Sequence, residues 1–71
     1  MRRMLNTLFI LSEETYLALE NENVVVKNDD KILGRVPLLN LENILYFGYK
    51  GVSPLLMGEC ARRKIGLCFF R

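Results

Sequence analysis

The chain of 71 residues contains no histidine and no tryptophan, and it has only two cysteines. Histidine is the commonest general base and metal ligand at neutral pH, so Ser12 and Ser53 lack the usual partner of a nucleophilic serine. Two cysteines without a histidine or a Cys-x-x-Cys spacing argue against a zinc site. We therefore expect Cys60 and Cys68, both on apolar positions, to be buried reduced thiols. We also expect the chain to build no catalytic site of its own.

The sequence also has little net charge and no long hydrophobic run. Ten Lys and Arg residues against eight Asp and Glu residues give +2, which does not by itself indicate nucleic-acid binding. No apolar run approaches the length of a membrane span. The apolar stretch near the N-terminus is interrupted by Asn6 and by Glu13-Glu14, unlike a secretory signal. We expect a cytoplasmic location and no membrane partner.

Apolar residues make up 51% of the chain. Such a composition is typical of a globular domain rather than a disordered one, and the length allows one domain, residues 1–71. A chain this short buries only a limited core. We therefore expect an apolar face that is left over for a partner.

Six short stretches of apolar or alternating residues predict strands. They are Thr7–Leu11, Tyr16–Glu20, Val24–Val26, Lys31–Val36, Ile44–Phe47 and Leu67–Phe70. Asn21-Glu22 is typical of a two-residue hairpin turn, and Gly34 indicates either a bulge or a close backbone approach inside its strand. The carboxylate pairs Glu13-Glu14 and Asp29-Asp30 fall in predicted turns, so we interpret them as solvated rather than as acid–base groups.

One helix is predicted, near residues 53–64. Ser53 can cap its first turn, Pro54 suits the first helical position, and Gly66 is a plausible stop. Two helical faces are expected: an apolar one with Leu56, Met57, Cys60 and Ala61, and a polar one with Gly58, Glu59, Arg62 and Arg63. A strand on each side predicts a parallel pair joined by a crossover helix, and hence an α+β fold that is β-rich.

Three cations are the candidates for contact with a nucleic-acid backbone: Lys50, Arg62 and Arg63. Lys50 lies in Gly48-Tyr49-Lys50-Gly51, just before the helix N-terminus, where backbone N–H groups favour an anion. The same four residues match the GXXG loop of KH domains, although there the loop joins two helices. Arg62 and Arg63 sit in the last helical turn, where cations also simply complement the helix dipole. With so few clustered cations we expect weak DNA binding.

Several segments together resemble the N-terminal domain of the CRISPR-associated integrase, the metal-dependent endonuclease of spacer acquisition. The resemblance rests on the order of Val36-Pro37-Leu38 with Asn40-Leu41-Glu42, then Phe47-Gly48-Tyr49, then Val52-Ser53-Pro54 with Leu56-Met57, and it covers essentially the whole chain. It implies a β-sandwich-like domain of about six strands that holds two protomers together.

The resemblance also implies features that this chain does not carry. In the family, a helical catalytic domain binds a divalent metal, Mg²⁺ or Mn²⁺, and joins new DNA to the repeat array, and a second adaptation protein clamps the dimers. We expect that domain to be absent here, with a boundary beyond Arg71, so that the chain is a truncated fragment without a cofactor of its own. Some members also place an aromatic ring in the first hairpin turn, where this chain has Ser12-Glu13-Glu14-Thr15.

Two functions therefore follow from the sequence. The first is the dimerisation and scaffold domain of an integrase–endonuclease that inserts new spacers in antiviral defence. The second is a free-standing, dimeric, β-rich nucleic-acid-binding module. Both predict a homodimer that binds DNA weakly, and neither makes the chain alone an active enzyme.

Overall fold

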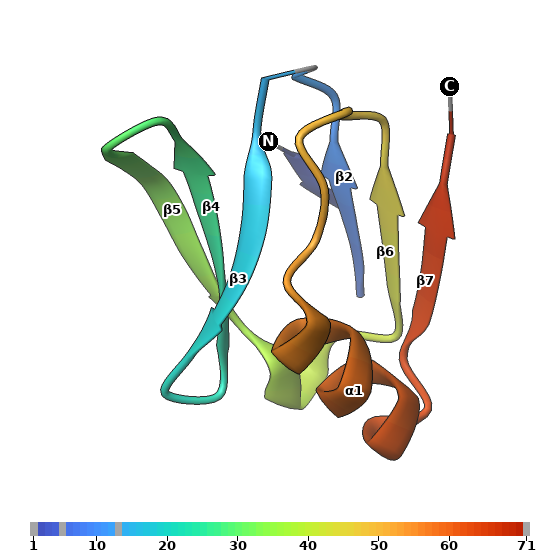
Figure 1. The fold of residues 1–71 in the computed structure, drawn as a ribbon. Helices are drawn as coiled ribbons and strands as arrows, with labels where there is room; N and C mark the ends of the chain where they lie inside the picture. Colours follow the sequence, from blue (N-terminus) through green and yellow to red (C-terminus); the bar gives the residue numbers. More distant parts are fainter. Residues whose placement is uncertain (1, 5, 13, 71) are drawn as a thin grey trace.

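The computed structural model describes residues 2–4, 6–12 and 14–70. In these residues seven strands form two sheets, and one α-helix packs beside them (Figure 1). In chain order the elements are β1 (Arg2–Met4), β2 (Thr7–Ile10), β3 (Tyr16–Glu20), β4 (Asn23–Asn28), β5 (Lys31–Pro37), a 3₁₀ turn (Leu38–Asn40), β6 (Asn43–Tyr46), α1 (Pro54–Arg63) and β7 (Gly66–Phe69). The predicted β-rich α+β fold is confirmed. The six predicted strands are all present, and β1 is an additional one. Glu13, in a predicted turn, lies outside the described residues.

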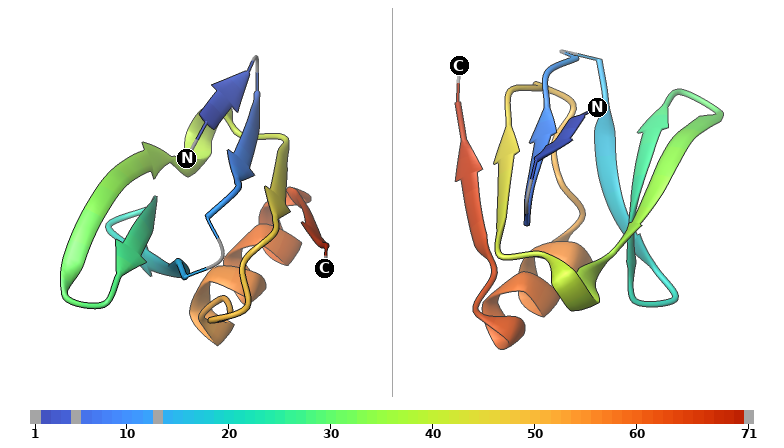
Figure 2. Two further views of the ribbon diagram at one scale, coloured as in Figure 1. Left: turned by 90° about the horizontal axis from the view of Figure 1, so that it is seen from above. Right: turned by 180° about the vertical axis from the view of Figure 1, so that it is seen from behind.

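The two sheets differ in the direction of their strands. The first has the order β1-β2-β6-β7, in which β2, β6 and β7 run parallel and β1 is antiparallel to β2. The second is the antiparallel meander β3-β4-β5. The crossover from β6 through α1 to β7 therefore joins parallel neighbours, as predicted. Figure 2 shows the two sheets side by side, with α1 and the 3₁₀ turn at the same end.

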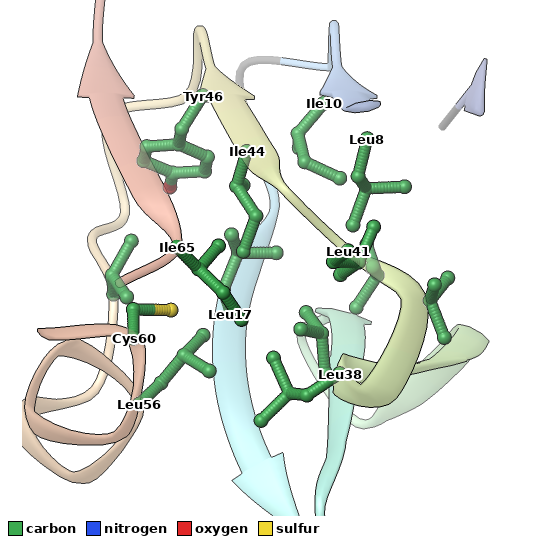
Figure 3. Close-up of a cluster of buried hydrophobic side chains, with 14 residues drawn as sticks. Leu8, Ile10, Leu17, Leu38, Leu41, Ile44, Tyr46, Leu56, Cys60 and Ile65 are labelled. Carbon is green, nitrogen blue, oxygen red and sulfur yellow. The ribbon is translucent and has the colours of Figure 1, made fainter. Parts of the chain in front are cut away.

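One hydrophobic core joins both sheets to α1 and the 3₁₀ turn (Figure 3). Alternate residues of the central strands enter it, because successive side chains of a strand point to opposite faces. Leu8, Ile10, Ile44 and Tyr46 come from the first sheet, and each is at most 1% exposed. The others are Leu17, Val24, Val26, Val36, Leu38, Leu41, Val52, Leu56, Cys60 and Ile65.

The turns of the meander follow the local sequence. Asn21 and Glu22 both have positive φ, 50° and 62°, as a two-residue hairpin turn between right-twisted strands requires. In β5 the pairing with β4 shifts, so that Gly34 pairs with Val26 but Ile32 pairs with Lys27. The extra residue, Leu33, forms a bulge directly before Gly34, and the predicted irregularity is confirmed.

The start of α1 also agrees with the prediction, whereas its end and its buried face do not. The Ser53 Oγ accepts a hydrogen bond from the Leu56 N–H at 3.1 Å. The helix ends at Lys64, which adopts the left-handed conformation with φ 60°, so the prediction of Gly66 as the stop is wrong. Gly66 instead begins β7. The chain turns before Gly66 because Asn43 and Gly66 must face each other in the β6–β7 ladder.

The buried face of α1 is rotated from the predicted one. Leu56 and Cys60 are buried, but Met57 and Ala61 are exposed. The rotation follows from what covers the helix, since α1 packs between β3 and β7 rather than on one flat sheet. Cys68 is exposed on β7, so the prediction of two buried thiols holds only for Cys60. Burial also raises the pKa of the Cys60 thiol.

In the part of the chain that the structure describes, no helix has the length and hydropathy needed to cross a lipid bilayer.

A single buried hydroxyl group joins the two sheets at the other end of the core. Tyr46, at the end of β6, donates to the carbonyl of Thr15, just before β3, and accepts from the Gly51 N–H at 2.8 Å. A Cβ atom on Gly48 would lie 2.6 Å from the Tyr46 Oη, so the chain needs glycine there. Gly51 has a φ of +106°, which L side chains rarely adopt.

Tyr46→Phe is expected to lower the free energy of unfolding by about 1–3 kcal/mol, because the Thr15 carbonyl and the Gly51 N–H then lose a partner in a buried site. Urea unfolding measures the change. Tyr49→Phe is the matched control, since Tyr49 is 61% exposed and its change should stay within about 0.5 kcal/mol. Equal stability of both variants would contradict the assigned role of the Tyr46 hydroxyl.

Candidate nucleic-acid interface

The loop from Phe47 to Ser53 carries Lys50 and crosses from the first sheet to the second. Its last residues pair with β3: the Leu17 N–H donates to the Gly51 carbonyl at 3.2 Å, and the Ser53 N–H donates to the Leu17 carbonyl at 2.8 Å. Together with the Tyr46 bond to Gly51, these contacts hold the base of the loop from both sides. The loop therefore presents Lys50 from a backbone that is anchored on both sheets.

Lys50 lies beside an exposed aromatic ring. Both Lys50 and Tyr49 are exposed, and the Lys50 Nζ is 6.0 Å from the centroid of the Tyr49 ring. A cation and an accessible ring side by side can contact a phosphate and stack on a base. The arrangement has the chemistry of a weak nucleic-acid contact that does not depend on sequence.

The backbone N–H groups at the start of α1 contribute less to anion binding beside Lys50 than their place at a helix N-terminus suggests. Pro54 has no N–H, and the N–H of Leu56 is used by the Ser53 side chain. The Met57 N–H already makes the first bond of the helix, to the Ser53 carbonyl at 3.0 Å. An anion at this end of α1 would therefore depend mainly on Lys50.

Arg62 and Arg63 lie at the opposite end of α1 from Lys50. A helix of ten residues is roughly 15 Å long, so the three predicted cations do not form one cluster. Both arginines are engaged with carboxylates. The Arg62 Nε donates to Glu59 at 3.2 Å, and the Arg63 Nε donates to Glu59 at 2.6 Å. The Arg63 Nη2 also donates at 2.6 Å to Glu22, in the turn between β3 and β4.

These ion pairs give the polar face of α1 a structural role. The Arg63 side chain is 20% exposed and the Glu59 side chain 18% exposed, so neither projects freely into water. The two arginines hold the pKa of Glu59 at about 2, far below its usual 4.5, and Glu59 raises the pKa of both arginines. A phosphate at Arg63 would compete with two carboxylates, whereas Lys50 faces no such competitor among the described ion pairs.

The described residues do not fit a divalent metal. No three Cys, Asp or Glu residues gather closely enough within residues 2–4, 6–12 and 14–70 to hold a metal ion. Glu59 is saturated by two guanidinium groups, and Asp29 and Asp30 lie at the tip of the β4–β5 hairpin. Mg²⁺ and Mn²⁺ need several oxygen ligands in one place, and the described residues offer no such set.

Two residues that organise this region had no signal in the sequence. Tyr46 reads as a strand residue, and its partner Thr15 is 31 positions away in the chain. Glu22 reads as a turn residue, and its partner Arg63 is 41 positions away. Both contacts depend on the packing of one sheet against the other, which the local pattern does not specify.

A family model for CRISPR associated protein Cas1 matches residues 8–71 of the chain. The curated CRISPR-associated endonuclease Cas1 1 of Chlorobaculum tepidum is 38% identical over 69 residues, which are 97% of this chain and 20% of that protein. CRISPR-associated endonuclease Cas1 2 of Rhodospirillum rubrum is 42% identical over 65 residues, which are 92% of this chain and 19% of that protein. The chain thus spans about a fifth of the length of the curated relatives it matches.

A solved structure has the same fold. One chain of a Cas6-RT-Cas1--Cas2 complex superposes with a TM-score of 0.83 at 22% sequence identity, over 90% of this chain and 7% of that chain. This match supports the arrangement of the two sheets and of α1.

Glu59→Gln is expected to reduce stability at neutral pH and to have progressively less effect in acid. The pKa of Glu59 is about 2 in the folded chain against an ordinary 4.5, so its contribution is complete above about pH 4.5 and is lost as the pH falls toward 2. The difference in Tm between wild type and variant should therefore shrink below pH 4.5. Glu14→Gln, which removes an exposed carboxyl group, controls for net charge. A difference that is constant from pH 7 to pH 2.5 would rule out the ion pairs as its source.

Proposed function

Because the chain belongs to the Cas1 family of CRISPR-associated proteins, we propose that it is the N-terminal dimerisation and scaffold domain of a DNA integrase that inserts new spacers into a CRISPR array. Family membership favours this function over a free-standing binding module. Dimerisation, DNA contact and partners are each part of the proposal. So are a cytoplasmic location and the absence of a cofactor and of DNA cleavage in this stretch of chain.

The observation that carries the proposed dimer is the exposed apolar edge of the meander. In β5, Ile32 is 45% exposed and Leu33 is 48% exposed, and both lie on the last strand of the three-stranded sheet. Apolar side chains in adjacent positions on an edge strand are a recognised site of association. The bulge at Leu33 interrupts the regular ladder of this edge. Contact through side chains therefore fits better than a continuous sheet across two protomers.

An interface at this edge would place α1 away from the two-fold axis of the dimer. The helix packs against β3 and β7, whereas β5 is the opposite edge of the meander (Figure 1). A stable interface buries about 800 Å² per protomer. The accessible surface of the chain is 4708 Å², so such an interface would use about a sixth of it. A two-fold contact of this size closes on itself and does not lead to fibres.

The proposed partner of the dimer is a second CRISPR adaptation protein. One solved structure that shares this fold is a Cas6-RT-Cas1--Cas2 complex. A dimer that presents Lys50 from each protomer would offer DNA two identical weak contacts. Because such contacts add through their effective concentration, a weak site on each protomer is sufficient for a scaffold.

Sedimentation equilibrium at micromolar concentration tests the dimer. Wild type is expected to sediment as a dimer, and Ile32→Glu as a monomer, because the new charge would be buried against its copy. Leu55→Glu is the matched control: Leu55 is 74% exposed on α1, and a carboxylate near a helix N-terminus is tolerated. A monomeric wild type with a melting temperature independent of concentration would overturn the proposal.

Lys50→Glu tests the DNA contact. Wild type is expected to bind duplex DNA of any sequence with a Kd on the order of 10⁻⁴ to 10⁻⁶ M or weaker, and more weakly as salt rises. The substitution should weaken binding uniformly across sequences in a fluorescence anisotropy titration at low salt. Lys64→Glu makes the same change of charge at the exposed C-terminal end of α1, away from the proposed dimer edge, and is expected to have a smaller effect. Equal binding by wild type and Lys50→Glu would remove Lys50 from the DNA surface.

A further inference from the structure

The outer face of the four-stranded sheet, which points away from the core, carries two rows of apolar side chains. Phe9, Leu45 and Cys68 form one row, because Phe9 pairs with Leu45 and Leu45 pairs with Cys68. Their neighbours along each strand, such as Leu8 and Ile44, point into the core, so this row faces the opposite side.

A second row continues the same alignment two residues further along. The Phe47 N–H donates to the Ile10 carbonyl, and the Phe70 N–H donates to the Tyr46 carbonyl, each at 2.9 Å, so the ladder extends past the strand ends. Leu11, Phe47 and Phe70 are therefore side by side, and they are 54%, 38% and 41% exposed. The rings of Phe47 and Phe70 stack with centroids 4.8 Å apart. The six residues of the two rows form what we term the outer apolar grid.

The parallel direction of the strands indicates that the outer apolar grid is a covered face. β2, β6 and β7 are parallel, and parallel strands occur almost only in sheets with both faces covered, usually by helices. The core covers the inner face. On the described faces of β2, β6 and β7, polar side chains appear at the far end, where Thr7 pairs with Asn43. The sequence of these strands is thus that of a sheet covered on both sides.

The size of the outer apolar grid favours a single helix as the element that covers it. Three strands spaced about 4.8 Å apart, and two rows about 7 Å apart along the strands, give a footprint roughly 10 Å by 10 Å. This is far below the roughly 800 Å² per partner of a stable interface between two proteins. A helix is about 10 Å wide and rises 5.4 Å per turn, so two to three turns would cover the grid.

We propose that the outer apolar grid is the docking surface for one amphipathic helix from the part of longer Cas1 family members that lies outside the stretch matched here. Four fifths of each curated relative lies outside that stretch, since the match covers 20% and 19% of their lengths. The inference goes beyond the proposed dimer and uses a different surface, since Ile32 and Leu33 are on β5 of the other sheet. The apolar stripe of the helix faces the grid, and its polar face remains in water.

The exposed thiol of Cys68 gives a direct test. The probe protein is the full-length C. tepidum relative with its matched stretch replaced by these 71 residues, and the reference is the 71-residue chain. Both are treated with iodoacetamide, and the labelled peptides are identified by mass spectrometry. Cys68 is expected to react at least tenfold more slowly in the full-length chimera than in the short chain. Cys60, which is buried, should react slowly in both.

A photo-crosslinker identifies the occupant. Replacing Phe47 by p-benzoyl-L-phenylalanine preserves an aromatic ring in the grid and is expected to yield crosslinks to positions three or four residues apart outside the matched stretch. The same replacement of Leu55, on α1, is the control and should not crosslink to those positions. If the chimera is insoluble, the crosslinker is placed instead at the position of the unaltered relative that matches Phe47.

Two results would overturn the proposal that a helix docks on the grid. Labelling of Cys68 at the same rate in the chimera and in the short chain would show an uncovered face. Crosslinks from position 47 to the grid of a second copy would show that the chain itself is the occupant. Neither result bears on the dimer through β5, which Ile32→Glu tests separately, so failure of the two proposals can be told apart.

Discussion

The arrangement of this domain depends on the hydroxyl group of Tyr46. This buried group, carried by β6, bonds to two other segments: the connection before β3 at Thr15 and the loop before α1 at Gly51. The two sheets are joined at this end by the loop, which pairs with β3, and at the other end by the hydrophobic core beneath α1. A buried hydrogen-bonding group has few alternative partners, so it fixes one relative position of the sheets where apolar packing alone would tolerate several.

The position of α1 follows from the same constraint. With the loop fixed at Gly51 and Ser53, the helix must begin beside β3 and return to β7, which places it across the end of the core. Its Leu56 and Cys60 side chains then point inward, and Arg63, which also bonds to Glu59, reaches Glu22 in the turn between β3 and β4. The ion pairs that remove Arg63 from a DNA surface are therefore a consequence of how the helix is docked. Of the three candidate cations, Lys50, near the other helix end, is therefore the one that faces no carboxylate among the described ion pairs.

Much of the fold could be predicted from the sequence because it depends on neighbours in the chain. Alternation along strands, positive φ at Asn21 and the Ser53 cap are local properties, and all are present in the structure. The errors concern long-range packing. Met57, Ala61 and Cys68 were predicted to be buried, but their burial depended on which elements would cover them. A periodic pattern shows that a face is apolar, but it does not show whether its cover lies within the same stretch of chain. The partly buried Glu59–Arg63–Glu22 contacts had no local signal at all.

The order of the strands has a consequence for how the domain folds. β2 pairs with β6, so Thr7 meets Asn43 across 36 residues, and the whole meander lies between them. The meander itself is made of neighbouring hairpins with turns of two residues, at Asn21-Glu22 and Asp29-Asp30. Short loops close quickly and at low entropic cost, whereas the parallel ladder must wait for a long segment to become ordered. We therefore expect the meander to form first and to act as the template on which the parallel strands assemble, the strands at the sheet edges being exposed longest to other chains.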